Sequence, residues 1–113
     1  MIARIWSARA TPARAPVYAD HLRSHVLPML RAVDGYAGAT LLQRRASAGV
    51  EIVVITWWRS LEAVRAFAGA DVDAAVVADE AASLLTRFDR RARHYTVEMQ
   101  DAIAAPGRRG ERA

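Results

Sequence analysis

The sequence predicts a single α+β domain with the ferredoxin-like order β-α-β-β-α-β and a four-stranded antiparallel sheet. The spacing of apolar residues has the period of a strand in some segments and of a helix in others, and these segments follow one another in this order. Within one expected strand, residues 52–55 (Ile-Val-Val-Ile) are apolar whichever way they point, so both faces of the sheet need cover. A chain of 113 residues can cover one face of such a sheet with its own helices.

We expect a second copy of the chain to cover the other face, because twofold homodimers bury the same surface on both subunits. Neighbouring residues of a strand point to opposite faces, so Trp57 and Trp58 are expected on different sides of the sheet. We expect Trp57 at the homodimer interface and Trp6 there as well.

The first half of the chain reads as strand, helix and strand. A first strand is expected over residues 1–10, and the near-helical spacing of apolar residues predicts a helix over 15–32. Pro28 lies inside this helix and is expected to kink it or to end it early. Two glycines within residues 34–38 indicate a turn, which leads into a second strand over about 38–46.

The second half begins with a short hairpin connection into a third strand over residues 50–58. Ser60 is a good N-cap for a helix over 60–68, because its hydroxyl can accept a hydrogen bond from a free backbone N–H. One or two further helical pieces are expected over residues 71–86, and the last strand over about 90–99. We expect residues 1–100 to form the domain and residues 101–113 to be a flexible polar tail.

Composition excludes several kinds of chemistry. The chain has no cysteine, which removes thiolate nucleophiles, disulfides and cysteine-ligated zinc. All 16 basic residues are arginine, so Schiff-base catalysis and a phosphate-binding loop lysine are excluded. The net charge of +4 comes from arginines scattered along the sequence, which argues against a nucleic-acid partner.

The pattern of hydropathy argues against a membrane partner. No apolar run approaches the roughly 20 residues that a membrane-spanning helix needs. The N-terminus begins directly in a strand-like pattern rather than with the charged and apolar regions of a secretory signal. We therefore expect a cytoplasmic protein.

Three stretches of the sequence resemble the antibiotic biosynthesis monooxygenase family: residues 1–6 (Met-Ile-Ala-Arg-Ile-Trp), 34–38 (Asp-Gly-Tyr-Ala-Gly) and 58–63 (Trp-Arg-Ser-Leu-Glu-Ala). The resemblance covers roughly residues 1–99. Because that family belongs to the dimeric α/β-barrel superfamily, it implies that two copies pair the open faces of their sheets into a barrel. The same fold carries several activities, so the resemblance indicates the fold more specifically than the reaction.

Haem-degrading members of this family use an asparagine on the first strand, a tryptophan on the second helix and a histidine on the next helix. These positions fall at or near Ser7, Phe67 and Val77. The chain departs from the pattern at all three, and valine cannot ligate iron. The resemblance therefore argues against haem degradation by that mechanism.

The leading functional hypothesis from the resemblance is a cofactor-independent monooxygenase that needs no metal. It would hold an aromatic or quinol-type small molecule between sheet and helices, where deprotonation lets the substrate react with oxygen. His94 on the last strand is the candidate catalytic base, because histidine can accept a phenolic proton near neutral pH. Trp58, Phe67 and Ser7 are the candidate substrate-binding residues, with Trp58 as a stacking wall.

Each candidate also has a purely structural interpretation. Trp58 can be a core residue, and His94 can be satisfied by a neighbouring carboxylate or carbonyl. His21 and His25 share a helix face, but two ligands do not make a metal site, so both are expected to be solvated. The remaining candidates are arginines that either stabilise an oxyanion or are ordinary surface charges: Arg4, Arg59 and Arg93.

A second hypothesis is a non-catalytic dimeric barrel that binds a small hydrophobic ligand in a stress or accessory role. The departures from the haem-enzyme pattern and the absence of asparagine favour it. An open cavity with converging polar groups would instead favour an enzyme.

Overall fold

The structure is a computed structural model of the chain and describes residues 1–101. The expected tail over residues 101–113 therefore lies, apart from its first residue, outside the described part of the chain. Among the helices within residues 1–101, each is too short or too polar to cross a membrane.

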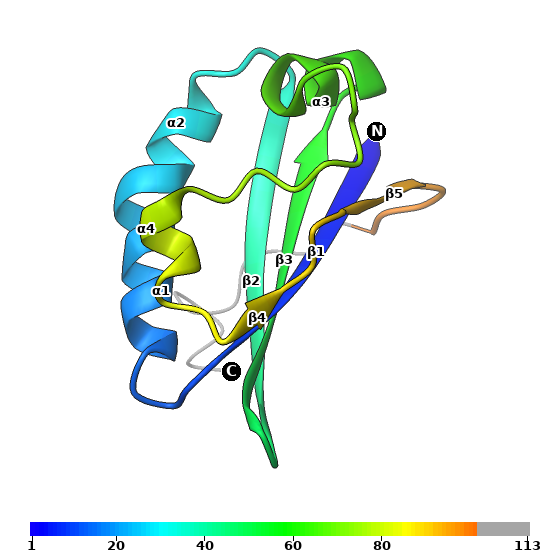
Figure 1. Cartoon of the computed structure of the whole chain (residues 1–113). Helices are drawn as coiled ribbons and strands as arrows, with labels where there is room; N and C mark the ends of the chain where they lie inside the picture. The colour runs from blue at the N-terminus through cyan, green and yellow to red at the C-terminus, as the bar shows by residue number, and fades with distance from the viewer. Residues whose placement is uncertain (102–113) are drawn as a thin grey trace, which may run out of the picture.

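An antiparallel sheet forms one layer of the molecule, and its topology confirms the ferredoxin-like α+β fold (Figure 1). The long hairpin of the second and third strands lies beside the first strand, and the C-terminal strands pair with the far edge of the first. The strands are β1 (Ile2–Ala10), β2 (Tyr36–Ala46), β3 (Gly49–Trp58), β4 (Arg87–Phe88) and β5 (Arg93–Thr96).

The last strand differs from the prediction because it is divided into β4 and β5. The backbone N–H of Asp89 still donates to the Ser7 carbonyl of β1, at 2.9 Å. Three residues later the N–H of Ala92 donates instead to the Asp73 carbonyl, at 2.7 Å. The chain therefore leaves β1 between the two strands in order to pair with a loop on the helical side.

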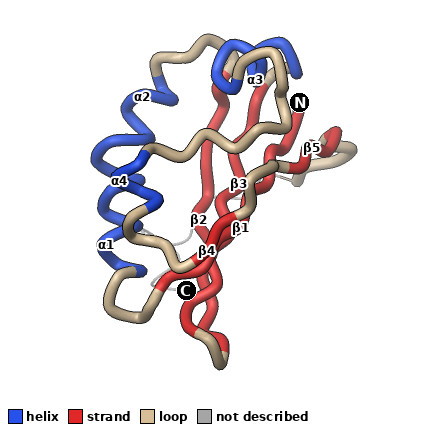
Figure 2. The backbone as a smooth tube through the Cα atoms, in the orientation of Figure 1, coloured by secondary structure: helices blue, strands red, loops and turns tan. Residues whose placement is uncertain are grey.

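The helices lie on one side of the sheet (Figure 2). The helix expected over residues 15–32 is present, but its α-helical hydrogen bonding is interrupted just before Pro28. Proline has no N–H to donate to the carbonyl four residues back, and the chain widens there into a π-helical turn. The helical elements are α1 (Ala15–His21), the π-helical turn η1 (Leu22–Val26), α2 (Leu27–Arg31), α3 (Leu61–Ala68) and α4 (Asp79–Ala82).

The segment after α3 is less helical than predicted. Residues 72–78, here called the strap, belong to the loop that joins α3 to α4 and form no helix: they begin in a turn and then run on to α4 (Figure 2). Their backbone bonds to the β4–β5 connection instead: Ala74 forms a bridge with Arg91, and the Ala75 N–H donates to the Arg90 carbonyl at 2.9 Å. These tertiary bonds replace the helix that the sequence pattern indicated.

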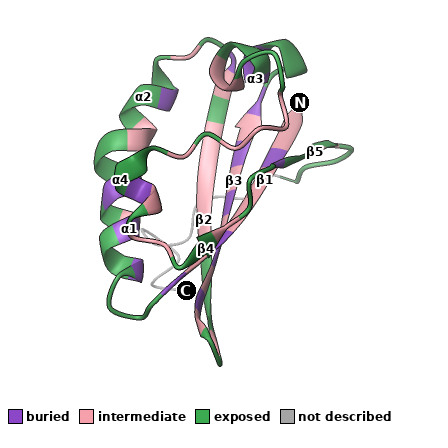
Figure 3. Cartoon of the chain, viewed as in Figure 1, coloured by how far each residue is buried: buried purple, intermediate pink, exposed green. Residues whose placement is uncertain are grey.

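Alternation along β3 divides the sheet into a helix-facing side and an open side (Figure 3). Trp57 is half-buried on the open side, together with Val53 and Ile55, as the two-sided apolar pattern predicted. The expectation that Trp6 lies at the homodimer interface is wrong, because Trp6 lies on the helix-facing side of β1. The residues of β3 buried beneath the helices are Val50, Ile52, Val54, Thr56 and Trp58.

Candidate active site

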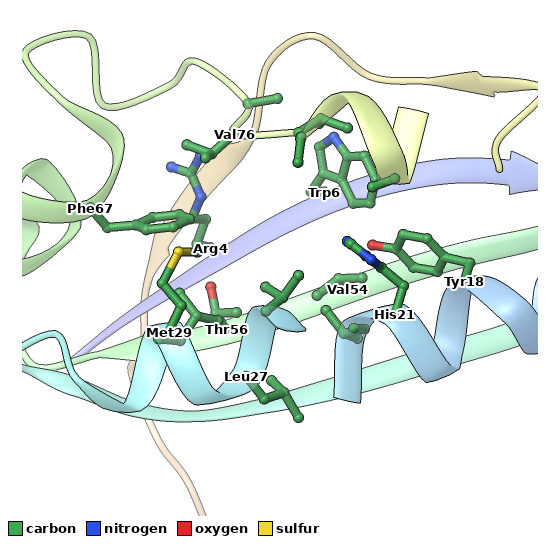
Figure 4. Close-up of a pocket in the computed structure, with 17 residues that line it drawn as sticks. Arg4, Trp6, Tyr18, His21, Leu27, Met29, Val54, Thr56, Phe67 and Val76 are labelled. Carbon is green, nitrogen blue, oxygen red and sulfur yellow. The ribbon is translucent and has the colours of Figure 1, made fainter. Parts of the chain in front are cut away.

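A cavity of about 310 Å³ lies between the helix-facing side of the sheet and the helical layer (Figure 4). Strands β1 and β3 form its floor, and the helical stretch from α1 to α2 forms one wall. The strap and α4 form the opposite wall, and α3 contributes one aromatic ring. The side chains discussed below that line it are Arg4, Trp6, Tyr18, His21, Met29, Val54, Thr56, Phe67, Val76 and Val77.

Arg4 is a buried cation at one end of this cavity and is only 5% exposed. Its Nη1 donates to the Val72 carbonyl at 2.6 Å and to His94 Nε2 at 2.9 Å, and its Nη2 donates to the Ala74 carbonyl at 2.7 Å. The guanidinium carbon also lies 5.6 Å from the centre of the Phe67 ring. These contacts tie the strap to β1 and fix the orientation of the guanidinium.

Burial lowers the pKa of Arg4 from its ordinary value, and the negative charge of Asp73 partly opposes this shift. An arginine pKa lowered from so high a value still leaves the side chain charged at neutral pH. The cavity therefore contains a permanent positive charge with little hydration.

His94 lies directly behind Arg4 and contacts it on the helix-facing side of β5. Arginine can only donate, so His94 Nε2 must be the acceptor and carries no proton. The ring proton is then on Nδ1, which donates to Asp73 Oδ1 at 3.0 Å. Both ring nitrogens are thus engaged, and His94 is not among the residues that line the cavity.

His21 lies at the other end of the cavity and is only 8% exposed. Its Nε2 is buried without a hydrogen-bond partner among residues 1–101, and its Nδ1 is 3.9 Å from a carboxylate oxygen of Glu80. The expectation that both helix histidines are solvated holds for His25, which stacks on His21 at 5.2 Å, but is wrong for His21. Tyr18 and Leu22 are buried on the same helix face and bring His21 inward with them.

Tyr18 stands beside His21 in the cavity wall, with its ring centre 6.4 Å from that of His21 and 6.3 Å from that of Trp6. Burial raises the pKa of the Tyr18 hydroxyl to about 12. The phenol therefore stays protonated at neutral pH and is available as a hydrogen-bond donor. Trp6 is less available, since its indole N–H already donates to the Asp89 carbonyl at 2.8 Å.

The candidate substrate-binding residues occupy different places. Phe67 lines the cavity. Trp58 is fully buried beneath it: the two rings stack at 5.4 Å, and the Trp58 indole donates to Thr56 Oγ1 at 2.8 Å. Ser7 faces away, on the open side of the sheet opposite Val53.

The other arginine candidates also lie outside the cavity. Arg59 is an exposed partner of Asp34, and Arg93 pairs in register with Ile5 on the open side of the sheet.

Tyr18 and His21 are the site residues that the sequence patterns did not indicate. A signal was present, because Tyr18, His21 and Leu22 have the three- and four-residue spacing of one helix face. The face was therefore identifiable as buried, and a histidine within it as unusual. No comparable signal connects Asp73 with His94, since these residues lie far apart in the sequence.

The described part of the chain holds no cluster of three or more metal-ligating side chains. Within the cavity lining, His21 is the residue whose side chain commonly ligates metals. Phe67 and Val77, which stand at or near two positions of the haem-degrading pattern, both line the cavity but offer no iron ligand.

Comparison with known proteins identifies one family and several similar folds. The sequence model described as antibiotic biosynthesis monooxygenase matches residues 1–78. No curated protein matches the chain.

Among solved structures, the monooxygenase of the Streptomyces coelicolor gene ActVA-Orf6, in complex with nanaomycin D, is 19% identical. The match covers 92% of this chain and 91% of that chain, with a TM-score of 0.57. The Mycobacterium tuberculosis haem degrader MhuD, solved with two haems in its active site, is 22% identical over 90% of this chain and 100% of its own, with a TM-score of 0.59. Rv0793 from the same organism is 20% identical over 91% and 98%, with a TM-score of 0.53. These likenesses show a shared fold.

Proposed function

Because the chain belongs to the antibiotic biosynthesis monooxygenase family, as its resemblance predicted, we propose that it is a cofactor-independent monooxygenase of an aromatic or quinol-type small molecule. The substrate lies in the cavity between the sheet and the helices. The cavity volume of about 310 Å³ suits a flat ligand of two or three fused rings. The apolar walls favour burial of such rings, and Phe67 adds an aromatic ring to the lining.

The observation that carries this proposal is the distal nitrogen of His21, which is buried at the cavity wall without a partner among the described residues. An unsatisfied buried polar atom is costly, and a partner that arrives with the substrate removes that cost. A phenolic hydroxyl is such a partner, since neutral imidazole can accept its proton. We assign His21 the role of base and Tyr18 the role of hydrogen-bond donor to the resulting phenolate.

The reaction then balances with oxygen as the only co-substrate. His21 takes the proton of the phenolic hydroxyl, and the electron-rich ring transfers electrons to O₂. A carbon–oxygen bond forms at a ring carbon that bears hydrogen. The resulting hydroperoxide loses that hydrogen as a proton and its outer oxygen as water, which leaves a quinone. One oxygen atom enters the product and the other forms water, and the substrate supplies all the electrons.

We propose that His94 acts in this site without touching the substrate. Its two nitrogens are engaged by Arg4 and Asp73, so it serves as a positioning residue for Arg4. Trp58 likewise serves as a positioning residue for Phe67, because its ring stacks on the Phe67 ring from beneath.

We also propose that the protein is a homodimer through the open side of its sheet. That side carries half-buried Val53, Ile55 and Trp57 together with Leu42, which is 47% exposed. A contiguous apolar surface of this kind is typical of an interface. Two copies paired there would form the dimeric α/β barrel implied by the family.

The test is oxygen uptake by the purified protein with a panel of dihydroxynaphthalenes and anthrones. We expect uptake to fall by at least about 100-fold in His21→Ala, because general-base catalysis typically contributes that much. His25→Ala is the matched control: it removes a neighbouring exposed histidine and should leave uptake unchanged. Retention of uptake in His21→Ala with loss in His94→Ala would return the role of base to His94.

The same panel separates the enzyme from the ligand-binding alternative. Tight binding of these compounds without oxygen uptake, measured by calorimetry, would contradict the proposed reaction and support a non-catalytic barrel for small hydrophobic ligands.

A further inference from the structure

The charge of Arg4 has no direct counter-ion in the described structure. Among residues 1–101, no acidic side chain forms an ion pair with Arg4. Asp73 reaches it only through the His94 ring, and Asp73 is itself 3.6 Å from the Arg91 guanidinium. None of the cavity-lining residues is acidic either. A ligand in this cavity therefore meets a positive charge that no carboxylate of the described residues neutralises by direct contact.

The guanidinium also retains donor capacity. Three of its N–H groups donate, to the Val72 carbonyl, the Ala74 carbonyl and His94. A guanidinium has five N–H groups, so the Nε–H and one N–H of Nη2 remain. Two donors on one planar fork match the two oxygens of a carboxylate.

Asp73 and His94 fix the direction of this fork. Because His94 must accept from Arg4, its only proton is on the side of Asp73, and the Asp73 carboxylate stabilises that tautomer. The guanidinium is thus held from behind by the His94 ring and from the side by the strap carbonyls. It needs little reorganisation to bind an anion.

The cavity has a second polar end, well separated from Arg4. Arg4 lies opposite Thr56 in the sheet, whereas Trp6, two residues further along β1, lies opposite Val54 and contacts Tyr18. Two residues of a strand span about 7 Å. Figure 4 shows Arg4 and Phe67 at one end of the cavity and Tyr18 and His21 at the other.

We infer that the ligand of this cavity is a hydroxylated aromatic acid of two or three fused rings. Its carboxylate is bound by Arg4, which Asp73 and His94 position, and its hydroxyl lies at the opposite end beside His21. The hydroxyl end rests on the proposed function, whereas the carboxylate end rests on the Arg4 geometry alone. Binding of the carboxylate can therefore be tested without any reaction.

The experiment is calorimetric titration of the protein under nitrogen with three naphthalene probes. The first carries a hydroxyl and a carboxylate at opposite ends of its two rings, the second carries the same groups on neighbouring carbons, and the third is naphthol. We expect the first probe to bind at least about tenfold more tightly than either of the others, because only it reaches both polar ends and a charge-assisted bidentate pair is strong.

The variants identify the groups responsible. Arg4→Met should remove the advantage of the first probe over naphthol. His94→Leu should reduce that advantage, whereas His94→Gln should keep it, because the glutamine oxygen can accept from Arg4 while its NH₂ donates to Asp73. Naphthol affinity should stay the same in both His94 variants, which a general loss of structure would not allow. If Arg4→Met fails to fold, the two His94 variants decide the question.

Three results would overturn the inference: no binding of the first probe, equal affinity for the first probe and naphthol, or an advantage that survives Arg4→Met in the folded protein. Failure of the proposed function gives a different result. In that case the first probe binds as expected under nitrogen, and admission of oxygen produces no uptake with any of the dihydroxynaphthalenes or anthrones.

Discussion

At the scale of single residues, the Tyr18 hydroxyl is held in a mostly apolar wall where a phenolate would lose its hydration. Burial raises the pKa of Tyr18 to about 12 in the folded protein. The unfolded chain has the ordinary tyrosine pKa of about 10. The stabilisation that follows is fully present below the unfolded pKa and is lost as the pH rises through the folded pKa, because the unfolded state ionises first.

We expect the free energy of unfolding to fall by about 2 kcal/mol between about pH 9 and pH 12 on account of this residue. Tyr18→Phe should lack that part of the pH dependence. Tyr95→Phe is the control, since Tyr95 is 51% exposed and should behave as wild type. Urea unfolding at the two pH values, with phenolate absorbance measured alongside, checks the prediction. An identical decrease in wild type and Tyr18→Phe would contradict it.

The site was only partly predictable because its residues come together for different reasons. The strand period places Arg4 and Trp6 on one face, and the helix period places Tyr18 and His21 on another. The sequence does not show which histidine nitrogens are left without a hydrogen-bond partner in the folded protein. His94 was the natural candidate for a base, and only the contact with Arg4 shows that its acceptor nitrogen is occupied.

At the scale of elements, the helix α3 is seated on the turn that precedes β2. A Cβ atom on Gly35 would lie 2.4 Å from the Cβ of Ala63 in α3, and Gly35 has a φ of +94°. Gly69, which ends α3, has a nearly identical φ of +95°, but a Cβ atom added there would have no neighbour within 4 Å. Both glycines have a positive φ, but only Gly35 is also closely packed. Substituting each of them therefore distinguishes the cost of the backbone conformation from the cost of close packing.

We expect Gly69→Ala to cost about 1–3 kcal/mol through the backbone conformation alone, because its φ of +95° and ψ of −169° are adopted almost exclusively by glycine. Gly35→Ala should cost about 1–3 kcal/mol more than Gly69→Ala, because overpacking against α3 adds to the strain of a positive φ. Urea unfolding of the two variants measures the difference. The double variant Gly35→Ala with Ala63→Gly should recover part of the loss, and equal costs at the two glycines would show that contact with α3 is unimportant.

Prediction was reliable for elements whose signals are local. Ser60 caps α3 as expected, accepting from the Ala63 N–H at 3.2 Å, and Pro28 disturbs its helix as expected. It held only in part over residues 71–86, where valine spacing suggested one or two helical pieces: α4 is present, but residues 73–75 bond to distant backbone instead. Tertiary hydrogen bonds outweigh weak local preferences there.

At the scale of the whole molecule, β3 serves two surfaces at once. Its buried residues pack beneath the helices, and its alternate residues form the open apolar side. A carboxylate placed among the apolar residues of that side should prevent association, since a paired sheet would desolvate it.

We expect wild type to be a dimer by light scattering and Ile55→Glu to be a monomer. Val17→Glu is the control, because Val17 is 48% exposed on α1 and lies away from the sheet. A monomeric wild type at tens of micromolar, or dimeric Ile55→Glu, would contradict assembly through this face.

The strap makes the binding specificity of this fold easy to alter. Its backbone is fastened at Val72 and Ala74 by Arg4, and at Ala75 by the Arg90 carbonyl. Its side chains beyond these points, at Val76 and Val77, form cavity wall without belonging to a helix or a strand. Mutational libraries restricted to those positions would reshape the ligand's outline while the scaffold keeps its geometry, which is a practical starting point for directed evolution toward new substrates.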